Sequence, residues 1–368
     1  MIIMAVRKTG ISHNLLIHPG ETLAEVLEDR EITQAELAAR TGVSTAYVNN
    51  IIKGKKGISA KFAMGLEYAL NVPKSFWMNL QSNYDSELLE LNEGQTIIEE
   101  ERVARDDLAE VVKYLRQKGV IPMREKKDES ILSLRKALQI SNIANLKNML
   151  PAGAFRMPSD KSVNPYVLGA WIRLCQIMGD SRVNACFDIS QTGKLIGEMK
   201  QIMLRNNADF QNELKETMKN YGIDFIIMKN FRGAPVQGYI SQKSDKTFQM
   251  VLTIRGAFAD IFWFSLFHEL GHIINGDIGK ISKFVDDGTD GEKELAADCF
   301  ARDALLEPES YRNFTEKEDF SIEAIERYAS SQNVMPYIVI GRLQKEKYLD
   351  YRSFSSYKLR YKWAKPIA

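Results

Sequence analysis

Two of the chain's four histidines stand four residues apart in the segment His268-Glu269-Leu270-Gly271-His272. Residues at this spacing share one face of an α-helix, so both imidazoles can reach one cation while the glutamate between them points toward a water bound to it. Residues 261–267 are apolar and bulky, which indicates a helix buried in a domain core. A core helix could contain this pattern without a metal, but a buried histidine pair without a ligand is costly. The residues therefore favour a metal site with Glu269 as a candidate general base.

A tetrahedral zinc site needs a third protein ligand, and the segment Glu294-Leu295-Ala296-Ala297-Asp298 offers a glutamate one helical turn before an aspartate. This segment resembles the ExxxD arrangement of gluzincin proteases. The resemblance implies that Glu294 binds the metal beside His268 and His272, and that Asp298 orients a ligand imidazole through its outer N–H. Glu292 is the alternative third ligand.

Three segments of the C-terminal half together resemble the ImmA/IrrE family of metallopeptidases. They are DIFWFSLFHELGH (260–272), ADCFARD (297–303) and VIGRLQ (339–344). The resemblance covers roughly residues 210 to 350. It implies a zincin-like domain and Zn²⁺-dependent endopeptidase chemistry, often directed at a regulatory protein.

The composition bounds the rest of the chain. A length of 368 residues exceeds one ordinary domain, and a hydrophobic content of 45% supplies core for two or three. Three scattered cysteines favour reduced thiols and a cytoplasmic protein, and no apolar run approaches a membrane span, so we expect no membrane partner. A net charge of +1 gives no general attraction to nucleic acid, so DNA binding would need a local surface.

The N-terminal residues predict such a surface. Thr33 to Glu36 has the pattern of a capping box that opens a helix, Gly42 fits a left-handed turn, and Ser44 is placed to cap the next helix. Helix, short glycine turn and helix form a helix-turn-helix, whose asparagines can read adenine and whose lysines can contact phosphates. The residues predicted to face DNA are Gln34, Thr45, Ala46, Tyr47, Asn49, Asn50, Lys53 and Lys55.

Residues 13–86 resemble the XRE-type, lambda-repressor-like domain of HigA-like antitoxins. The resemblance rests on IHPGETL (17–23), the turn just described and SFWMNLQSNY (75–84). It implies operator DNA and a small toxin protein as partners, with His18 in a packing or capping role. Residues 19–83 hold seven Lys and Arg against seven Asp and Glu, a net charge of zero, which keeps a protein-binding helical bundle open as the alternative.

Between these ends the pattern is first helical and then strand-like. Residues 87–210 predict a helical connector, and residues 224–228, 236–240 and 247–254 predict strands of a small sheet. We expect residues 236–240 to form either an edge strand that aligns an extended substrate or a purely structural strand. After Arg342, seven Lys and Arg against two acidic residues predict a solvated basic tail rather than a contact with DNA or an acidic partner.

The predicted fold is α+β and mostly α. It comprises a helix-turn-helix domain (13–86), a helical connector (87–210), a zincin-like domain with a small sheet and the His268-to-His272 helix (211–350), and a basic tail (351–368). The predicted function is a cytoplasmic DNA-binding regulator of HigA antitoxin type, expected to be a homodimer, whose zinc domain hydrolyses a regulatory protein partner. The alternative is a non-catalytic DNA-binding antitoxin or repressor whose metal site is structural or senses a ligand.

Overall fold

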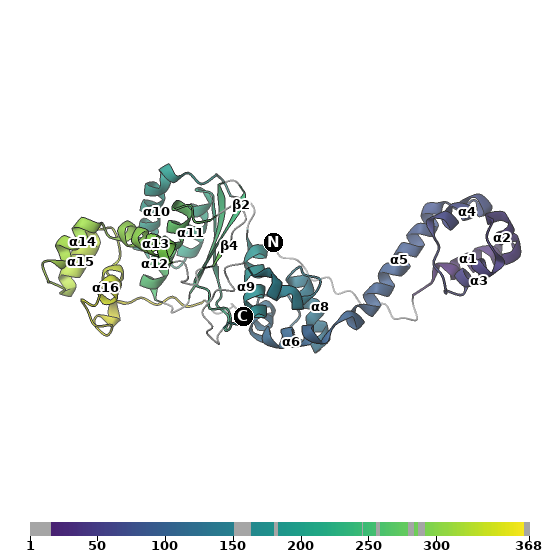
Figure 1. Cartoon of the computed structure of the whole chain (residues 1–368), viewed down its shortest axis with the longest axis horizontal. Coiled ribbons are helices and arrows are strands. Elements are labelled where there is room, and N and C mark those ends of the chain that lie inside the picture. The colour runs from purple at the N-terminus through teal and green to yellow at the C-terminus, as the bar shows by residue number, and fades with distance from the viewer. Residues whose placement is uncertain are drawn as a thin grey trace. The chain divides into compact units, whose positions relative to one another are not determined.

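The computed structural model in Figure 1 describes residues 16–150, 163–179, 183–244, 246–254, 258–278, 283–285 and 291–363. The described part is mostly helical with one small sheet, as predicted. The chain divides into two compact units, Met1–Arg102 with Glu125–Leu132, and Val103–Arg124 with Ser133–Ala368. No helix among the described residues is both long and apolar enough to cross a membrane. The start of the predicted N-terminal domain at residue 13 and the tail beyond residue 363 lie outside the described residues.

The first unit is built of short helices around one apolar core. They are α1 (Pro19–Asp29), α2 (Gln34–Thr41), α3 (Thr45–Ile52), α4 (Ala60–Leu70) and α5 (Lys74–Asn92), followed by the short 3-10 helix η2 (Glu93–Thr96). The side chains of Thr33, Ser44 and Ser59 cap α2, α3 and α4. The core runs from Leu23 to Trp77, and both of these side chains are fully buried.

His18 caps α1, which confirms its predicted role. Its Nδ1 accepts a hydrogen bond from the Gly20 amide at 2.9 Å, and Glu21 Oε1 accepts one from the His18 amide at 3.1 Å. Burial lowers the pKa of this imidazole, against the opposing effect of the nearby carboxylates of Glu21 and Asp85. Only a neutral Nδ1 can accept the Gly20 amide, so the cap depends on the deprotonated imidazole.

This cap should make the first unit less stable in acid. The pKa of His18 is lower in the folded state, so as the pH falls below about 6.5 the unfolded state takes up a proton that the folded state refuses. We expect the protection of α1 amides from hydrogen exchange to decrease between pH 7 and pH 5. His18→Asn keeps a good capping residue without the titration, and should show a smaller decrease. Equal pH dependence in both proteins would contradict this account.

The second unit combines helices with a four-stranded sheet. Before the sheet come α7 (Ala109–Gln117), α9 (Pro165–Met178), α10 (Thr192–Arg205) and α11 (Phe210–Lys219), with 3-10 helices η3 (Ile143–Met149) and η5 (Ile189–Gln191). After its third strand come α12 (Ala259–Ile274), α13 (Gly291–Leu305), α14 (Pro308–Thr315), α15 (Ile322–Ser331), α16 (Pro336–Lys345) and η6 (Ser355–Tyr357). The two units divide within α6 (Glu99–Asp107), between Arg124 and Glu125, and within α8 (Lys127–Ala137).

The sheet has the order β1-β3-β2-β4. Strand β1 (Ile223–Met228) is parallel to β3 (Thr247–Thr253), and β2 (Gly238–Ser244) is antiparallel both to β3 and to β4 (Lys283–Val285). All three strands predicted from the sequence are present, although β2 begins at Gly238 instead of residue 236, and β4 is the addition. Alternate residues Ile223, Phe225 and Ile227 of β1 belong to the large apolar core of this unit.

Of the two alternatives for residues 236–240, an edge strand and a purely structural strand, the edge strand is wrong. Strand β4 pairs with β2 through Tyr239↔Val285, Ile240↔Phe284 and Ser241↔Lys283, so β2 lies inside the sheet. The strands at the two edges are β1 and β4. A strand of three residues is too short to show an alternating pattern, so β4 could not be predicted from the sequence.

Helix α12 is the centre of the core, with thirteen of its sixteen residues buried. Its first amide, that of Ala259, donates to the carbonyl of Leu359 at 2.9 Å, and Trp263 Nε1 donates to the hydroxyl of Tyr361 at 2.9 Å. Leu359 and Tyr361 are partly buried against the core. The predicted solvated tail is therefore wrong for these residues, because the chain returns to the start of α12.

Helices α15 and α16 repeat the turn geometry that joins α2 to α3. Asn333 has a left-handed φ of 55°, and the amide of Val334 donates to the carbonyl of Ala329 at 3.1 Å. Gly42 has a φ of 72°, and the amide of Val43 donates to the carbonyl of Ala38, also at 3.1 Å. The second helix of the later pair is largely buried, with Tyr337, Ile338 and Ile340 among its buried residues. It packs closely on α12, since a β-carbon on Gly341 would lie 2.6 Å from Asp260 Oδ2.

Candidate metal centre and helix-turn-helix surface

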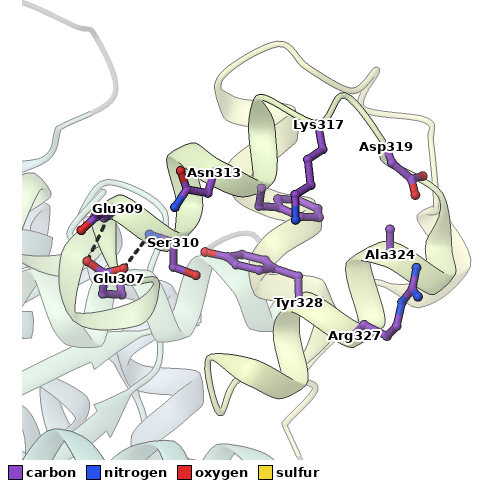
Figure 2. A pocket seen from close by; sticks show the side chains of 10 residues that line it. Glu307, Glu309, Ser310, Asn313, Lys317, Asp319, Ala324, Arg327 and Tyr328 are labelled. Carbon is purple, nitrogen blue, oxygen red and sulfur yellow. Dashed lines mark hydrogen bonds between the residues drawn. The ribbon is translucent and has the colours of Figure 1, made fainter.

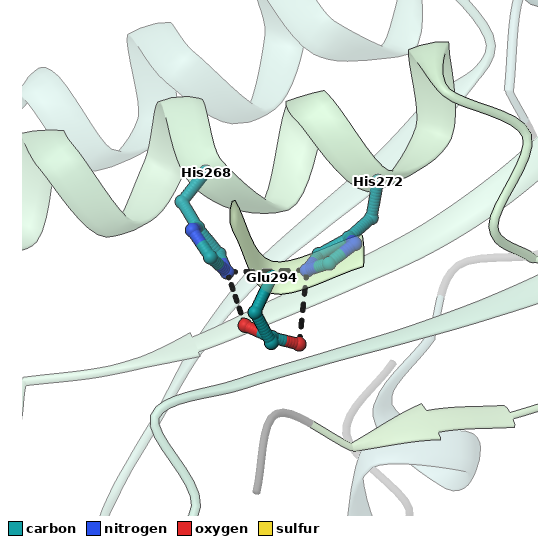
Figure 3. Close-up of side chains that lie close together, drawn as sticks. All are labelled: His268, His272 and Glu294. Atoms are coloured by element: carbon teal, nitrogen blue, oxygen red, sulfur yellow. Dashed lines mark hydrogen bonds and ion pairs between the residues drawn. The ribbon is translucent and has the colours of Figure 1, made fainter. Parts of the chain in front are cut away.

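Three metal-ligating side chains converge between α12 and α13. His268 and His272 project from the same face of α12, and Glu294 reaches them from the first turn of α13 (Figure 3). One ligand atom from each residue lies within 4.8 Å of the other two. Both histidines are buried, with exposed fractions of 6% and 0%. Helical spacing places the imidazoles together, whereas Glu294 arrives through the packing of two helices.

The distances within this cluster are within a few tenths of an ångström of those in a tetrahedral metal site. His268 Nε2 lies 3.1 Å from His272 Nε2 and 3.1 Å from Glu294 Oε2, and His272 Nε2 lies 3.5 Å from Glu294 Oε1. Ligand atoms about 2.0 to 2.2 Å from a tetrahedral zinc ion are about 3.3 to 3.6 Å from one another. Two imidazole nitrogens and a carboxylate are donors that zinc accepts, so the residues fit the ion.

Each imidazole is held by a carboxylate on its far side. His268 Nδ1 lies 2.8 Å from Asp298 Oδ1, and His272 Nδ1 lies 2.8 Å from Asp277 Oδ2. A hydrogen bond from Nδ1–H leaves the Nε2 lone pair of each ring aimed at the cluster. The hydrogen bond to His268 is the main reason that the pKa of Asp298 lies below its usual range. These two contacts favour, in both rings, the tautomer that binds a metal through Nε2.

A close approach of α12 and α13 makes this geometry possible. A β-carbon on Gly271 would lie 3.1 Å from Ala297 Cα, so a larger residue at position 271 would push the two helices apart. Glu292 is exposed on the first turn of α13, and the cluster among the described residues contains Glu294 instead. The structure thus places Glu294, the expected third ligand, beside the histidines.

The candidate general base packs against β2. Glu269 is fully buried, and a β-carbon on Gly238 would lie 1.5 Å from its Oε1 atom. Gln237, the residue before Gly238, donates from its Nε2 atom to Ser265 Oγ at 2.6 Å, and Ser265 lies one helical turn before Glu269. Gln237 and Gly238, where β2 begins, therefore fix both the position of α12 and the place of the Glu269 carboxylate.

Asp277 and Gly238 were not among the residues predicted from the sequence, yet both belong to the site. Helix α12 ends at Ile274 with Asn275 as its C-cap, Gly276 takes a left-handed φ of 73°, and the amide of Asp277 donates to the carbonyl of His272 at 3.1 Å. This turn folds the aspartate back onto the ring of His272. Asparagine and glycine directly after a helical pattern of apolar residues are a helix stop signal. This signal could have identified the turn that brings the following aspartate back to the helix.

In the first unit, α3 and the residues just after it carry the exposed part of the predicted DNA-binding surface. Thr45, Ala46 and Asn50 are exposed on α3, and Lys53 and Lys55 are exposed just after it. Asn49 is partly buried and its Nδ2 donates to Gln34 Oε1 at 3.2 Å, which ties the two helices together. Tyr47, predicted to face outward, is partly buried with its ring 5.2 Å from Phe62 and Lys56 above it at 4.4 Å.

Comparisons with known proteins match this part of the chain. A helix-turn-helix family model matches residues 23–77. Virulence-associated protein I of Dichelobacter nodosus is 33% identical over 75 residues, which cover 20% of this chain and 69% of that protein. The N-terminal domain belongs to the helix-turn-helix family. This helix-turn-helix domain is of the XRE type, and the matched residues run from within α1 to the first turn of α5.

Two further proteins resemble the helix-turn-helix domain. Virulence-associated protein A' of Dichelobacter nodosus is 41% identical over 69 residues, which cover 18% of this chain and 60% of that protein. The solved structure of Pseudomonas aeruginosa antitoxin HigA with the higBA promoter is 40% identical, covers 22% of this chain and 89% of that one, and has a TM-score of 0.21.

Proposed function

We propose that this chain is a DNA-binding regulator of HigA antitoxin type whose second unit is a zinc-dependent endopeptidase of ImmA/IrrE type. The observation that carries the catalytic half is the convergence of His268, His272 and Glu294 beside the buried carboxylate of Glu269. Its substrate would be a regulatory protein partner, cleaved within the cytoplasm.

His268, His272 and Glu294 would hold the zinc ion as three protein ligands. When bound, the ion supplies a Lewis acid and a water of lowered pKa. Asp298 and Asp277 hold the two imidazoles in one tautomer and one orientation. Glu269 stands on the same helix between the two ligands, where it would accept a proton from the attacking water and deliver it to the leaving amine. Gly238 keeps its carboxylate in that place.

The helix-turn-helix domain would bind operator DNA through α3. Membership of the helix-turn-helix family and the exposed residues Thr45, Ala46 and Asn50 support this half of the proposal. A homodimer would match two half-sites of an operator. A small toxin protein would be a further partner, as the resemblance to HigA implies.

Two substitutions near α3 should affect DNA binding differently. Asn50 is exposed on α3 and can read a base, so Asn50→Ala should cost about 1 to 3 kcal/mol and relax specificity. Lys55 follows the helix, so Lys55→Ala should weaken binding to all sequences and reduce the salt dependence. Binding-site selection followed by titrations at several salt concentrations measures both effects. If the wild type enriches no motif, the domain binds protein instead.

Gly238→Ala should remove catalysis without removing the metal. The new β-carbon would overlap the Glu269 carboxylate, and the loss of a placed general base costs about 100-fold or more in rate. Gly193→Ala is the matched control, because no side-chain or backbone neighbour lies within 4 Å of its β-carbon. Zinc content and cleavage rate should be measured together. A fully active Gly238→Ala protein would show that Glu269 does not act from this position.

The direct test of peptidase activity uses the protein encoded by the reading frame next to this one. The zinc-loaded chain should be mixed with that protein, and new termini sought by mass spectrometry. Cleavage by the wild type and none by Glu269→Gln supports the proposal. The non-catalytic alternative, in which the metal site is structural or senses a ligand, gains support if neither protein cleaves while zinc still changes operator affinity.

A further inference from the structure

A cavity of about 600 Å³ lies between α14 and α15, lined by residues outside the candidate metal centre. Phe314 and Tyr328 stack on each other within it, with ring centroids 4.3 Å apart and planes 6° apart. Figure 2 shows Glu307 and Glu309 at one end of this cavity and Lys317, Asp319 and Arg327 toward the other. Its size is that of a site for a small organic ligand.

One side of the cavity carries a regular polar stripe. Glu309, Asn313 and Lys317 recur at every fourth residue, so they follow one face of α14 and the residues just after it. The stripe places a carboxylate, an amide and an ammonium group in that order. With a helical rise of 1.5 Å per residue, the two charged positions are roughly 12 Å apart along the axis. Ala324 and Tyr328 of α15 line the facing side.

The charges at the two ends are opposite in sign. Glu307 and Glu309 give one end a charge of −2, while Lys317 and Arg327 against Asp319 give the other end +1. Glu307 accepts the amides of Glu309 and Ser310, and Asp319 accepts the amide and hydroxyl of Ser321. The Glu309 and Lys317 side chains make no hydrogen bond or ion pair with other described residues, so both remain available to a ligand.

We propose that this cavity binds a short peptide of three or four residues with both termini free. Three extended residues span about 10 to 11 Å, which matches the spacing of the two charged ends. Glu309 receives the ammonium group, Lys317 and Arg327 receive the carboxylate, and Asn313 hydrogen-bonds a peptide group between them. The apolar surface of Ala324 and Tyr328 contacts the central side chain. This proposal does not depend on the metal centre.

The test uses the peptide Ala-Leu-Ala, its N-acetyl derivative and its C-terminal amide, with calorimetry on the full chain. Blocking either terminus should weaken binding to the wild type about ten-fold, since each block removes one charge-assisted hydrogen-bonding group. Lys317→Gln should bind the free peptide about ten-fold more weakly and lose most of its sensitivity to amidation, because only Arg327 remains to receive the carboxylate. Glu309→Gln should likewise lose its sensitivity to acetylation while remaining sensitive to amidation.

Two controls separate this cavity from other surfaces. Lys345→Gln and Glu326→Gln change exposed charges of α16 and α15 that do not line the cavity, and both should bind like the wild type. His272→Ala should also bind the peptide, which would place the site away from the metal centre. The proposal is overturned if the wild type does not bind the free peptide, if blocked peptides bind equally well, or if Lys317→Gln keeps full sensitivity to amidation.

Discussion

His272→Ala should lose the metal. We expect the wild type to hold about one zinc ion per chain after dialysis against buffered zinc, and His272→Ala to hold less than about a tenth of that. The reason is that His272 Nε2 lies 3.1 Å from His268 Nε2 and 3.5 Å from Glu294 Oε1, so its removal leaves two ligands of three. Elemental analysis of both proteins at equal concentration measures the effect.

His18→Asn supplies the matched histidine control for this experiment. His18 lies in the first unit and caps α1, so its replacement should leave the zinc content unchanged. A wild-type protein that holds no metal, or a His272→Ala protein that holds a full complement, would refute the assignment of the ligands.

Glu269→Gln should keep zinc and DNA affinity but lose cleavage. Glutamine has the shape of glutamate and so fits against Gly238, yet it cannot accept the proton of an attacking water. General-base catalysis contributes about 100-fold to 10,000-fold to the rate, so the rate of cleavage of the partner protein should fall by about 100-fold or more. Asp298→Asn should be milder, on the order of 10- to 100-fold, because it acts through the orientation of His268.

Reporter expression in cells separates the catalytic proposal from its alternative. If cleavage relieves repression, Glu269→Gln should leave the operator repressed under conditions that derepress it in the wild type. Should Glu269→Gln regulate normally while His272→Ala does not, the metal serves structure or sensing, and the peptidase proposal fails.

The parts of the candidate site that could be predicted from sequence are those set by local spacing. Four residues on a helix fix the relative position of His268 and His272, and left-handed glycine after α2 fixes the turn before α3. Glu294 was predicted from a resemblance, and its position depends on how closely α12 approaches α13. That approach is set by Gly271 against Ala297, a contact that no single-helix pattern contains.

The features that sequence reasoning missed come from pairings between distant segments. Strand β4 has three residues and is defined by its partner β2, so nothing in its own composition identifies it. The return of Leu359 and Tyr361 to α12 was hidden by the basic residues around them, which suggested a solvated tail. Gly238 lay within a predicted strand, but its need to be glycine follows only from the carboxylate of Glu269 beside it.

The turns after α2 and after α15 have the same geometry, but the helices that follow them have opposite chemistry. After Gly42 the second helix exposes Thr45, Ala46 and Asn50, whereas after Asn333 the second helix turns Tyr337 and Ile338 into a protein interior. The same backbone hydrogen bond closes both turns. The same left-handed residue and hydrogen bond also close α1, at Glu31 and Ile32, so this backbone shape alone does not identify a DNA reader. What distinguishes a recognition helix is the solvent exposure of its polar side chains, which the fold of the turn does not determine.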